Sequence, residues 1–167
     1  MISEKSIPDL EKLLERKNKE VEIIQIVSNQ INKTLDLDVI AKAMLESMDK
    51  FFDFKHSMIL LLDDEEKFLS VLATHGYEEK GIGAKVPVGI GVIGTVAKRK
   101  KLMRMANMGM QLSYMQAIKK QINKDKNSNL NNEIELPGLK DVESQVAIPM
   151  LLDDELVGVF SVESNKV

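Results

Sequence analysis

The chain has 167 residues, which suits one domain with a modest appendage and is too short for two full-sized domains. A composition of 44% hydrophobic and 29% charged residues is typical of a soluble globular chain and excludes global disorder. The net charge of -3 points to neither a nucleic-acid binder nor an acidic tail, and the lack of cysteine excludes disulfides, thiolate nucleophiles, cysteine-ligated zinc and thioether-attached chromophores.

Residues 1–35 predict one long amphipathic helix, with Pro8 placed at an early position that helix N-termini prefer. A heptad seam with alternating steps of four and three follows at Leu10, Leu14, Lys17, Val21, Ile24, Ser28, Ile31 and Leu35. Packing on its own domain is the alternative, but the flanking "ERKNKE" is so polar that a narrow stripe fits a coiled-coil partner better. We expect a parallel homodimer. Its interface residues are predicted to be Leu10, Leu14, Val21, Ile24 and Ile31.

Residues 36–167 are expected to form the second part of the chain, and they open with a helix over Leu37–Phe52 whose apolar side belongs to the core. The run "HSMILLL" (56–62) then predicts a buried strand, and "KFLSVLATHGY" (67–77) the second arm of a hairpin around the acidic turn 63–66.

The middle and end of the chain complete a sheet. Residues 84–106 predict a short strand, a Gly-rich turn, a helix from about Val92 to Lys100 and an extended stretch at 101–106. Residues 144–152 and 156–164 form a second strand-turn-strand unit. Hairpins place neighbouring strands antiparallel, so the pattern indicates an α+β fold with helices flanking an antiparallel sheet.

The segment "GIGVIGTVAKR" contains the Gly-x-Gly-x-x-Gly pattern of dinucleotide-binding folds at Gly89, Gly91 and Gly94. That function requires a buried strand before the motif and an acidic residue about 20 residues after it. Pro87 would break the ladder of a central strand, and no acid occurs between Lys80 and Lys124. We therefore interpret the glycines as a tight entry into a short helix packed close to the sheet, with its N-H groups free to meet an anion as the alternative.

The same acid-free segment, Lys80 to Lys124, carries ten basic residues. A solvated basic face is one interpretation, and attraction of an anionic ligand or of an acidic partner through Lys98 to Arg104 is the other. No helix-turn-helix or zinc pattern accompanies the charge, so we expect no nucleic-acid partner.

Methionines gather in this region, with five of the ten at Met103, Met105, Met108, Met110 and Met115. They either fill the core beneath a loop or grip an apolar or aromatic ligand under a mobile cover, with Tyr114 and Arg104 adding a stacking face and a charge. The polar "NKDKNSNLNNE" (123–133) predicts a flexible loop.

Taken in order, "VPVGIGVIGTVAKRKKLMRM", "SQVAIPM" and "LVGVFSVES", preceded by "LDLDVIAKAMLESMDKFF", resemble the successive signatures of a GAF domain over residues 20–167. The resemblance implies a GAF/PAS-like fold, with a six-stranded antiparallel sheet flanked by helices and a pocket covered by loops. The chain stops at "ESNKV", before the acidic terminal helix usual in such domains, so we expect it to be truncated there.

The resemblance also implies pocket residues. The expected ligand-binding set is Ser57, Ile59, His75, Val88, Gly91, Thr95, Arg104, Met105, Asn107, Tyr114, Gln145 and Ala147. Enzymatic relatives of this fold reduce free methionine sulfoxide and require cysteines, which this chain lacks. We expect no catalytic residue and no metal site, since the two histidines, His56 and His75, have different neighbours and no Ser-His-Asp spacing occurs.

The sequence therefore predicts a non-catalytic module that senses a small molecule and dimerises, upstream of an adenylate or guanylate cyclase. A histidine kinase or a transcription activator is the alternative output, and a purely structural dimerisation module without ligand is the competing function. A cyclic nucleotide, haem and an apolar metabolite all remain open as ligands, so the cofactor is unknown. No apolar run matches a membrane span and the start lacks a signal peptide, which leads us to expect a cytoplasmic location with no membrane segment here.

Overall fold

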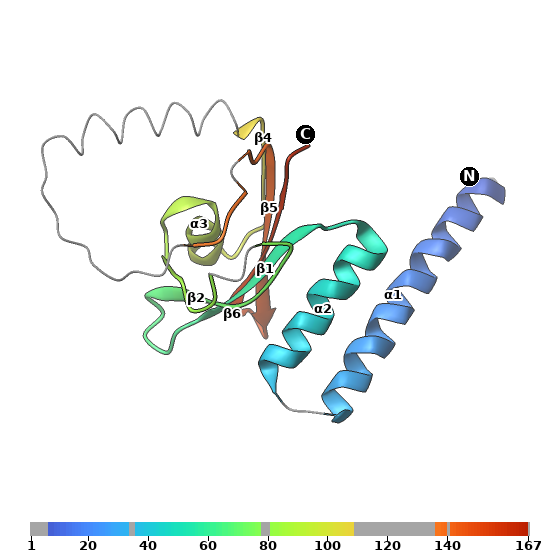
Figure 1. Cartoon of the computed structure of the whole chain (residues 1–167), viewed down its shortest axis with the longest axis horizontal. Helices are drawn as coiled ribbons and strands as arrows, with labels where there is room; N and C mark the ends of the chain where they lie inside the picture. The colour runs from blue at the N-terminus through green and yellow to red at the C-terminus, as the bar shows by residue number, and fades with distance from the viewer. Residues whose placement is uncertain (1–6, 34–35, 78–80, 109–135, 140, 167) are drawn as a thin grey trace, which may run out of the picture. The chain divides into compact units, whose positions relative to one another are not determined.

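The computed structural model describes residues 7–33, 36–77, 81–108, 136–139 and 141–166 (Figure 1). Its contacts divide the chain into two compact units, residues 1–53 and 54–167. The first unit holds two helices and the second holds a sheet with one further helix. None of the helices in the described ranges combines the length and the apolar character needed to cross a bilayer.

The first unit consists of α1 (Ile7–Lys33) and α2 (Leu37–Phe52), which contact each other. The carboxylate of Asp36 caps α2 by accepting from the Asp38 N–H at 3.1 Å, which satisfies one of the free donors of a helix start. Asp53 ends the helix in the left-handed conformation, at φ 61°. The Lys50 ammonium lies 3.4 Å from the Glu22 carboxylate and links the two helices.

The predicted seam of α1 lies on its exposed side. Its apolar members Leu10, Leu14, Val21 and Ile24 are 50%, 61%, 52% and 64% exposed. The half-buried apolar positions of α1 are instead Ile23, Ile26 and Val27. Ile31 lies within α1, but its side chain is outside the described part of the structure. Leu35 lies outside the described residues altogether. The contacts that α1 makes within the chain therefore leave the described part of the seam uncovered.

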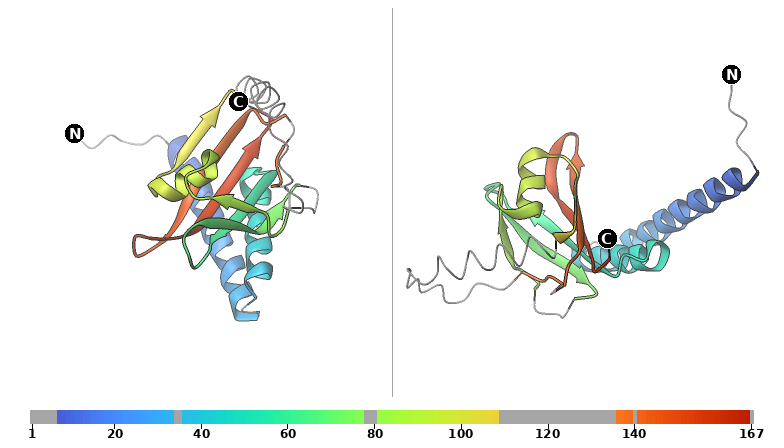
Figure 2. Two further views of the ribbon diagram at one scale, coloured as in Figure 1. Left: turned by 90° about the vertical axis from the view of Figure 1, so that its left-hand side faces the viewer. Right: turned by 90° about the horizontal axis from the view of Figure 1, so that it is seen from above.

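The second unit is a six-stranded sheet in the order β3-β2-β1-β6-β5-β4, and every pairing in it is antiparallel. The elements are β1 (His56–Leu62), β2 (Phe68–His75), β3 (Lys85–Pro87), α3 (Gly91–Arg99), β4 (Met103–Ala106), β5 (Ser144–Leu152) and β6 (Glu155–Ser164). Helix α3 lies over one face of the sheet (Figure 2). This confirms the predicted α+β class and the antiparallel sheet.

The core of the second unit lies between α3 and the sheet. Met58, Leu60 and Val159 contribute from the central strands, and Ile93 and Val96 from the helix, all of them buried. Side chains alternate between the two faces of a strand, so the period-two pattern of β1 sends Met58 and Leu60 toward α3 and the residues between them to the opposite face. This alternation decides below which predicted residues share a face with the cavity.

The glycines of the Gly-x-Gly-x-x-Gly segment allow a tight turn and close packing of α3. Gly89 has φ +89°, a conformation that side chains rarely adopt, and a Cβ at Gly94 would clash with the Pro87 carbonyl oxygen. Pro87 ends β3, an edge strand, where a missing N–H breaks no ladder bond. The expected tight entry into a short helix is confirmed, and the helix begins at Gly91, one residue before the expected Val92.

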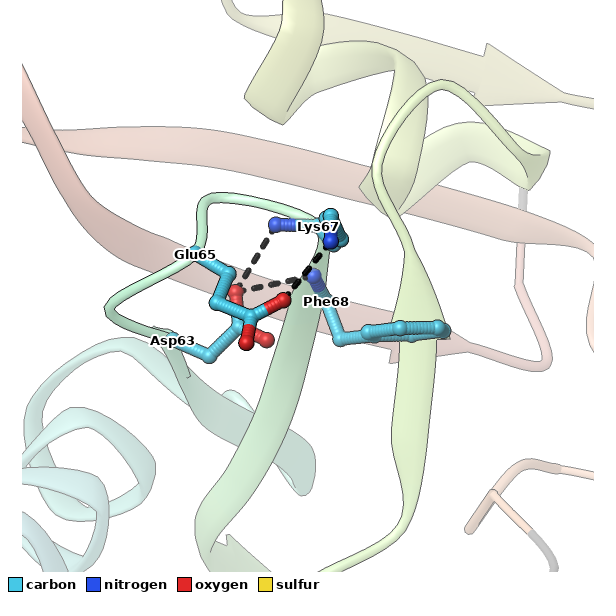
Figure 3. A network of polar contacts seen from close by, with 4 residues as sticks. All are labelled: Asp63, Glu65, Lys67 and Phe68. Carbon is cyan, nitrogen blue, oxygen red and sulfur yellow. Dashed lines mark hydrogen bonds and ion pairs between the residues drawn. The ribbon is translucent and has the colours of Figure 1, made fainter.

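The turn between β1 and β2 is closed by one carboxylate (Figure 3). Oδ1 of Asp63 accepts from the Lys67 N–H at 2.8 Å and from the Phe68 N–H at 3.0 Å, and the Asp63 N–H donates to the Phe68 carbonyl at 2.9 Å. The hydrogen bond from the Phe68 N–H lowers the pKa of Asp63 from 3.8, and the bond from the Lys67 N–H adds to this lowering. Burial opposes both, but the net pKa is lowered. The ionised carboxylate is therefore favoured by the folded hairpin.

We predict that Asp63→Ala lowers the midpoint of thermal unfolding by a few degrees at pH 7, because the Lys67 and Phe68 N–H groups lose their acceptor. A lowered folded pKa makes this stabilisation present above pH 3.8 and lost as the pH falls below that value toward the folded pKa. Calorimetry of both proteins between pH 2.5 and 7, ~4 pH units around the transition, measures the difference. Asp64→Ala in the same turn is the matched control, and a difference independent of pH would contradict the assignment.

Candidate functional site

A cavity of about 330 Å³ opens in the second unit beside the start of α3. It is bounded by α3, by the ends of β5 and β6, and by the extended segment Leu136–Leu139, which we call the strap. Its lining residues are Val86, Ile90, Gly91, Val92, Ile93, Met108, Leu136, Pro137, Gly138, Leu139, Val142, Gln145 and Glu163. The volume lies in the range of small-molecule sites, and aliphatic side chains dominate the walls.

The helix side of the cavity is apolar but electropositive. Ile90 is the N-cap of α3, and it has no side-chain oxygen with which to bond the first turn of the helix. The first backbone N–H groups of a helix carry a partial positive charge, so this wall of the cavity favours negative or electron-rich groups. The anion-binding interpretation of this turn stays a prediction.

The sheet side of the cavity carries its two polar side chains, Gln145 on β5 and Glu163 on β6, which are register partners. Gln145 is buried, and its Nε2 donates to the buried Ser161 hydroxyl at 3.0 Å. Oε2 of Glu163 accepts two hydrogen bonds, from the Tyr77 hydroxyl at 3.2 Å and from the Leu139 N–H at 2.9 Å. The carboxylate therefore ties the strap to the sheet.

Burial raises the pKa of the Glu163 carboxyl above 4.5, against the smaller opposing effects of the Leu139 N–H, the Tyr77 hydroxyl and the facing imidazole of His56. Burial, with the Glu163 charge and hydrogen bond adding to it, also raises the pKa of Tyr77, so the phenol stays protonated and donates. The His56 ring meets the Tyr77 ring edge to face, with centroids 5.6 Å apart. A protonatable carboxyl thus lies at one end of a mostly apolar cavity.

Two of the twelve predicted ligand residues, Gly91 and Gln145, line this cavity. Ser57 and Ile59 lie on the face of β1 opposite Met58 and Leu60, and His75 shares that face because it is the register partner of Ser57. The Ser57 hydroxyl is buried there and finds no hydrogen-bond partner among the described residues. The structure therefore places these three residues away from the cavity.

The other described members of the predicted ligand set also lie outside the cavity lining. Ala147 and Val88 belong to the core beneath α3 or pack against it. Arg104 and Asn107 are exposed, and Thr95 and Met105 are half-buried, while Tyr114 lies outside the described residues. Ligand binding by these residues stays a prediction.

Sequence reasoning missed Glu163, Tyr77 and the strap. A signal for Glu163 was present, since Val159, Ser161 and Glu163 follow the period-two pattern of one strand face, which is the face of β6 turned toward α3. An acidic residue near the end of a strand is normally expected to be solvated, so Glu163 was not identified as a site residue. The strap carried no signal, because its place follows from its contact with Glu163 and not from a periodic pattern.

Within the described part of the chain no group of three His, Cys, Asp or Glu side chains is arranged to hold a metal ion. The expected basic face is present in part, since Lys98 to Lys101 are exposed at the end of α3. Lys100 uses its ammonium to hold the Asp154 carbonyl at 2.9 Å. The described side chains therefore offer a ligand cavity and no arrangement typical of a metal site.

The family model described as GAF domain matches residues 34–167. Among solved structures, the chain is similar to the GAF domain of an Acinetobacter phosphoenolpyruvate-protein phosphotransferase, with 17% identity, a TM-score of 0.65, and coverage of 89% of this chain and 79% of that one. It is also similar to the nlh2 GAF domain of A. aeolicus in an inactive state, with 16% identity, a TM-score of 0.62, and coverage of 90% and 82%.

A third similar structure is an enzyme, the free methionine-R-sulfoxide reductase of Neisseria meningitidis in complex with its substrate. The identity is 14%, the TM-score is 0.57, and the match covers 86% of this chain and 71% of the reductase. No curated protein sequence matches the chain. At these identities the structural likeness shows the shared fold alone.

We predict that Glu163→Gln raises the midpoint of thermal unfolding by a few degrees at pH 7. The amide oxygen still accepts from Tyr77 and Leu139, while the cost of a buried charge disappears. A raised folded pKa makes the contribution of the wild-type carboxyl full below pH 4.5 and lost as the pH rises through the folded pKa. The variant's advantage should therefore grow as the pH rises above 4.5.

Differential scanning calorimetry across this pH range measures that difference. Glu155→Gln, an exposed acid at the other end of β6, is the matched control and should show no such trend. A parallel series in a His56→Gln background removes the imidazole that faces Glu163. If Glu163→Gln changed the unfolding midpoint equally at low and at neutral pH, folding would not raise the pKa of the Glu163 carboxyl.

Proposed function

The chain belongs to the family of GAF domains, which are regulatory modules of signalling proteins, and on this premise we propose that it senses a small molecule in the α3 cavity without catalysing a reaction. The α3 cavity is the space lined by the start of α3, the strap and the ends of β5 and β6. We further propose that the module dimerises through α1.

The observation that carries the sensing function is the combination of walls in that cavity. Aliphatic side chains supply most of its lining, and two polar side chains on neighbouring strands, Gln145 and Glu163, supply fixed hydrogen-bonding groups. Small-molecule sites are typically built in this way, with apolar walls for affinity and a few placed polar groups for orientation. The side chains of the described residues leave this volume open.

The strap offers a means of response. Its Leu139 N–H is bonded to Glu163, and Glu163 is itself part of the cavity wall. A ligand that engages the Glu163 carboxyl therefore competes with or strengthens the bond that holds the strap, and so favours one strap arrangement over another. Such a bias, passed on to α1 and to an output domain, is regulation by ligand. We favour a cyclase as the output, with a histidine kinase or a transcription activator as the alternatives.

The absence of catalysis is proposed on chemical grounds. One structural neighbour is a reductase of free methionine-R-sulfoxide, so the fold by itself is compatible with an enzyme. Thiol-based reduction of a sulfoxide needs a cysteine, and this chain has none. Glu163 and Tyr77 are the groups here whose pKa is raised. Tyr77 bonds to Glu163, and Glu163 bonds to the strap, so both groups have a positioning role.

The ligand proposal is tested by thermal unfolding of the whole chain, at fixed protein concentration, against cyclic AMP, cyclic GMP, haem and a set of small apolar metabolites. A ligand present at 100 times its Kd stabilises the native state by about 2.7 kcal/mol, which is a rise of several degrees. We expect at least one small compound to give a dose-dependent rise. If none does, the chain is better described as a structural dimerisation module.

Two variants locate the binding site. Ile90→Ala shortens a cavity wall at an exposed position and should weaken binding about five- to tenfold through lost apolar contact. Arg104→Ala changes an exposed residue that does not line the cavity and should leave binding unchanged. If Arg104→Ala weakened binding and Ile90→Ala did not, the ligand site would instead lie at the residues expected from the family resemblance.

Dimerisation is proposed from the exposed stripe on α1. Leu10, Leu14, Val21 and Ile24 recur at heptad spacing on one helix, on the side of α1 that its contacts with α2 leave exposed. Exposed apolar residues in a continuous row are typical of an interaction surface. A second copy of the same helix presents the same row, so the parallel homodimer follows from the repeat.

We predict that sedimentation equilibrium gives twice the chain mass of 18.8 kDa, and that Leu14→Glu shifts the protein to the monomer by placing a charge in the seam. Asn29→Glu adds the same charge to an exposed position of α1 outside the seam and should leave the dimer intact. A wild-type monomer at all concentrations, or a dimer that tolerates Leu14→Glu, would contradict the seam as the interface.

A further inference from the structure

The half-buried Glu163 carboxylate forms no ion pair among the described residues, and the cationic group nearest to it in register is the His56 imidazole. The ion pairs formed by the described residues lie on the helices of the first unit and in the β1–β2 turn, and none of them includes Glu163. Its two hydrogen bonds come from neutral donors, the Tyr77 hydroxyl and the Leu139 N–H. Buried carboxylates are normally paired with a cation or protonated, because an isolated charge is costly to take out of water.

The hydrogen bonding of this carboxylate is also one-sided. Both bonds go to Oε2, and the second oxygen, Oε1, receives none from the part of the chain that is described. An ionised carboxylate accepts about four hydrogen bonds through its two oxygens. Glu163 lines the cavity, so its carboxylate keeps unused acceptor capacity beside that space.

The other side chains of the α3 cavity are hydrocarbon or, at Gln145, an amide, and the only positive charge facing Glu163 in the described lining is the partial charge at the start of α3. Glu163 is its only ionisable lining residue in the described ranges, and Gln145 its only other polar side chain. The strap approaches the acid closely, since a Cβ at Gly138 would lie 3.9 Å from Glu163 Oε2. A ligand that satisfies these walls has one positively charged donor at one end and an apolar body behind it.

We propose that the α3 cavity binds a small primary amine in its protonated form, with the ammonium group on Oε1 of Glu163 and a compact hydrocarbon body against Ile90, Val92 and Leu139. The inference rests on the proposed sensing function and names the ligand class for the same cavity. At Glu163 a cation is favoured over a phosphate, because a phosphate there would meet a like charge. The ammonium supplies an ion-pair partner, and about two of its three donors can use the acceptor capacity that remains on the carboxylate.

Charge selection separates this inference from simple apolar binding. A neutral ligand of the same shape gains the same contact with the aliphatic walls but no ion pair. A charge-assisted hydrogen bond contributes about twice as much as a neutral one, and more where water is excluded. Discrimination between an amine and its alcohol analogue is therefore the property to measure.

The test is isothermal titration of the whole chain with 2-phenylethylamine, 2-phenylethanol and 3-phenylpropanoate at pH 7.5, a set that shares one hydrocarbon body and differs in charge. We expect the amine to bind about tenfold or more tightly than the alcohol, and the carboxylate to bind least. Glu163→Gln should weaken amine binding by about the same factor and change alcohol binding less than about twofold, since the amide keeps the shape and removes the charge. Glu155→Gln should change neither.

Unfolding of Glu163→Gln without ligand confirms that the variant is folded. Equal affinity for the amine and the alcohol, or an amine affinity that Glu163→Gln leaves unchanged, overturns the amine inference but leaves the α3 cavity as an apolar ligand site. Binding of none of the three compounds also overturns it. The proposed sensing function fails separately, if the full compound panel of its own test raises the unfolding temperature in no case.

Discussion

The close approach of α3 to the sheet is the constraint on which the second unit depends. Gly94 permits it, because any side chain there would collide with the Pro87 carbonyl oxygen, and the contact buries Ile93 and Val96 against Met58 and Leu60. The helix is short and ends at Arg99, so it covers only part of the sheet. Beside the start of α3 the strap lies over the sheet instead, bonded to it through Glu163, and the cavity opens between them. A packed helix at this place would fill that space.

Most of the sheet could be predicted from the sequence because its strands are built as local hairpins. The segments 56–62 and 144–152 are apolar runs next to acidic turns, and they appear as β1 and β5 with the expected bounds. Turn chemistry and strand period act within a few residues of each other, so they are visible in a single sequence. The pairing of β1 with β6, which joins the two hairpins into one sheet, is a long-range contact that no local pattern specifies.

The site was less predictable, for a reason that lies in strand geometry. Ser57 and Ile59 lie on the face of β1 opposite Met58 and Leu60, no residue of β1 lines the α3 cavity, and their predicted role in ligand binding stays a prediction. A one-residue shift in phase moves every side chain of a strand to the other side of a sheet. Which face of each strand is turned toward the cavity depends on which face of the sheet α3 covers. That packing is a tertiary contact and has no local sequence pattern. Gln145 was predicted and does line the cavity, since β5 turns it toward the same face as Ala147.

Glu163 connects stability with the proposed function. Its carboxyl anchors the strap through Leu139 and is held by Tyr77, yet burial makes its ionised form costly. A residue selected for stability alone would be an amide, which forms the same two bonds without a charge. The carboxyl at this place therefore lowers the stability of the empty cavity and increases the free energy that a cationic ligand gains on entering it. Under the proposed function, a cationic ligand that pairs with Glu163 would remove this cost, so its binding free energy would exceed what the contact area alone gives.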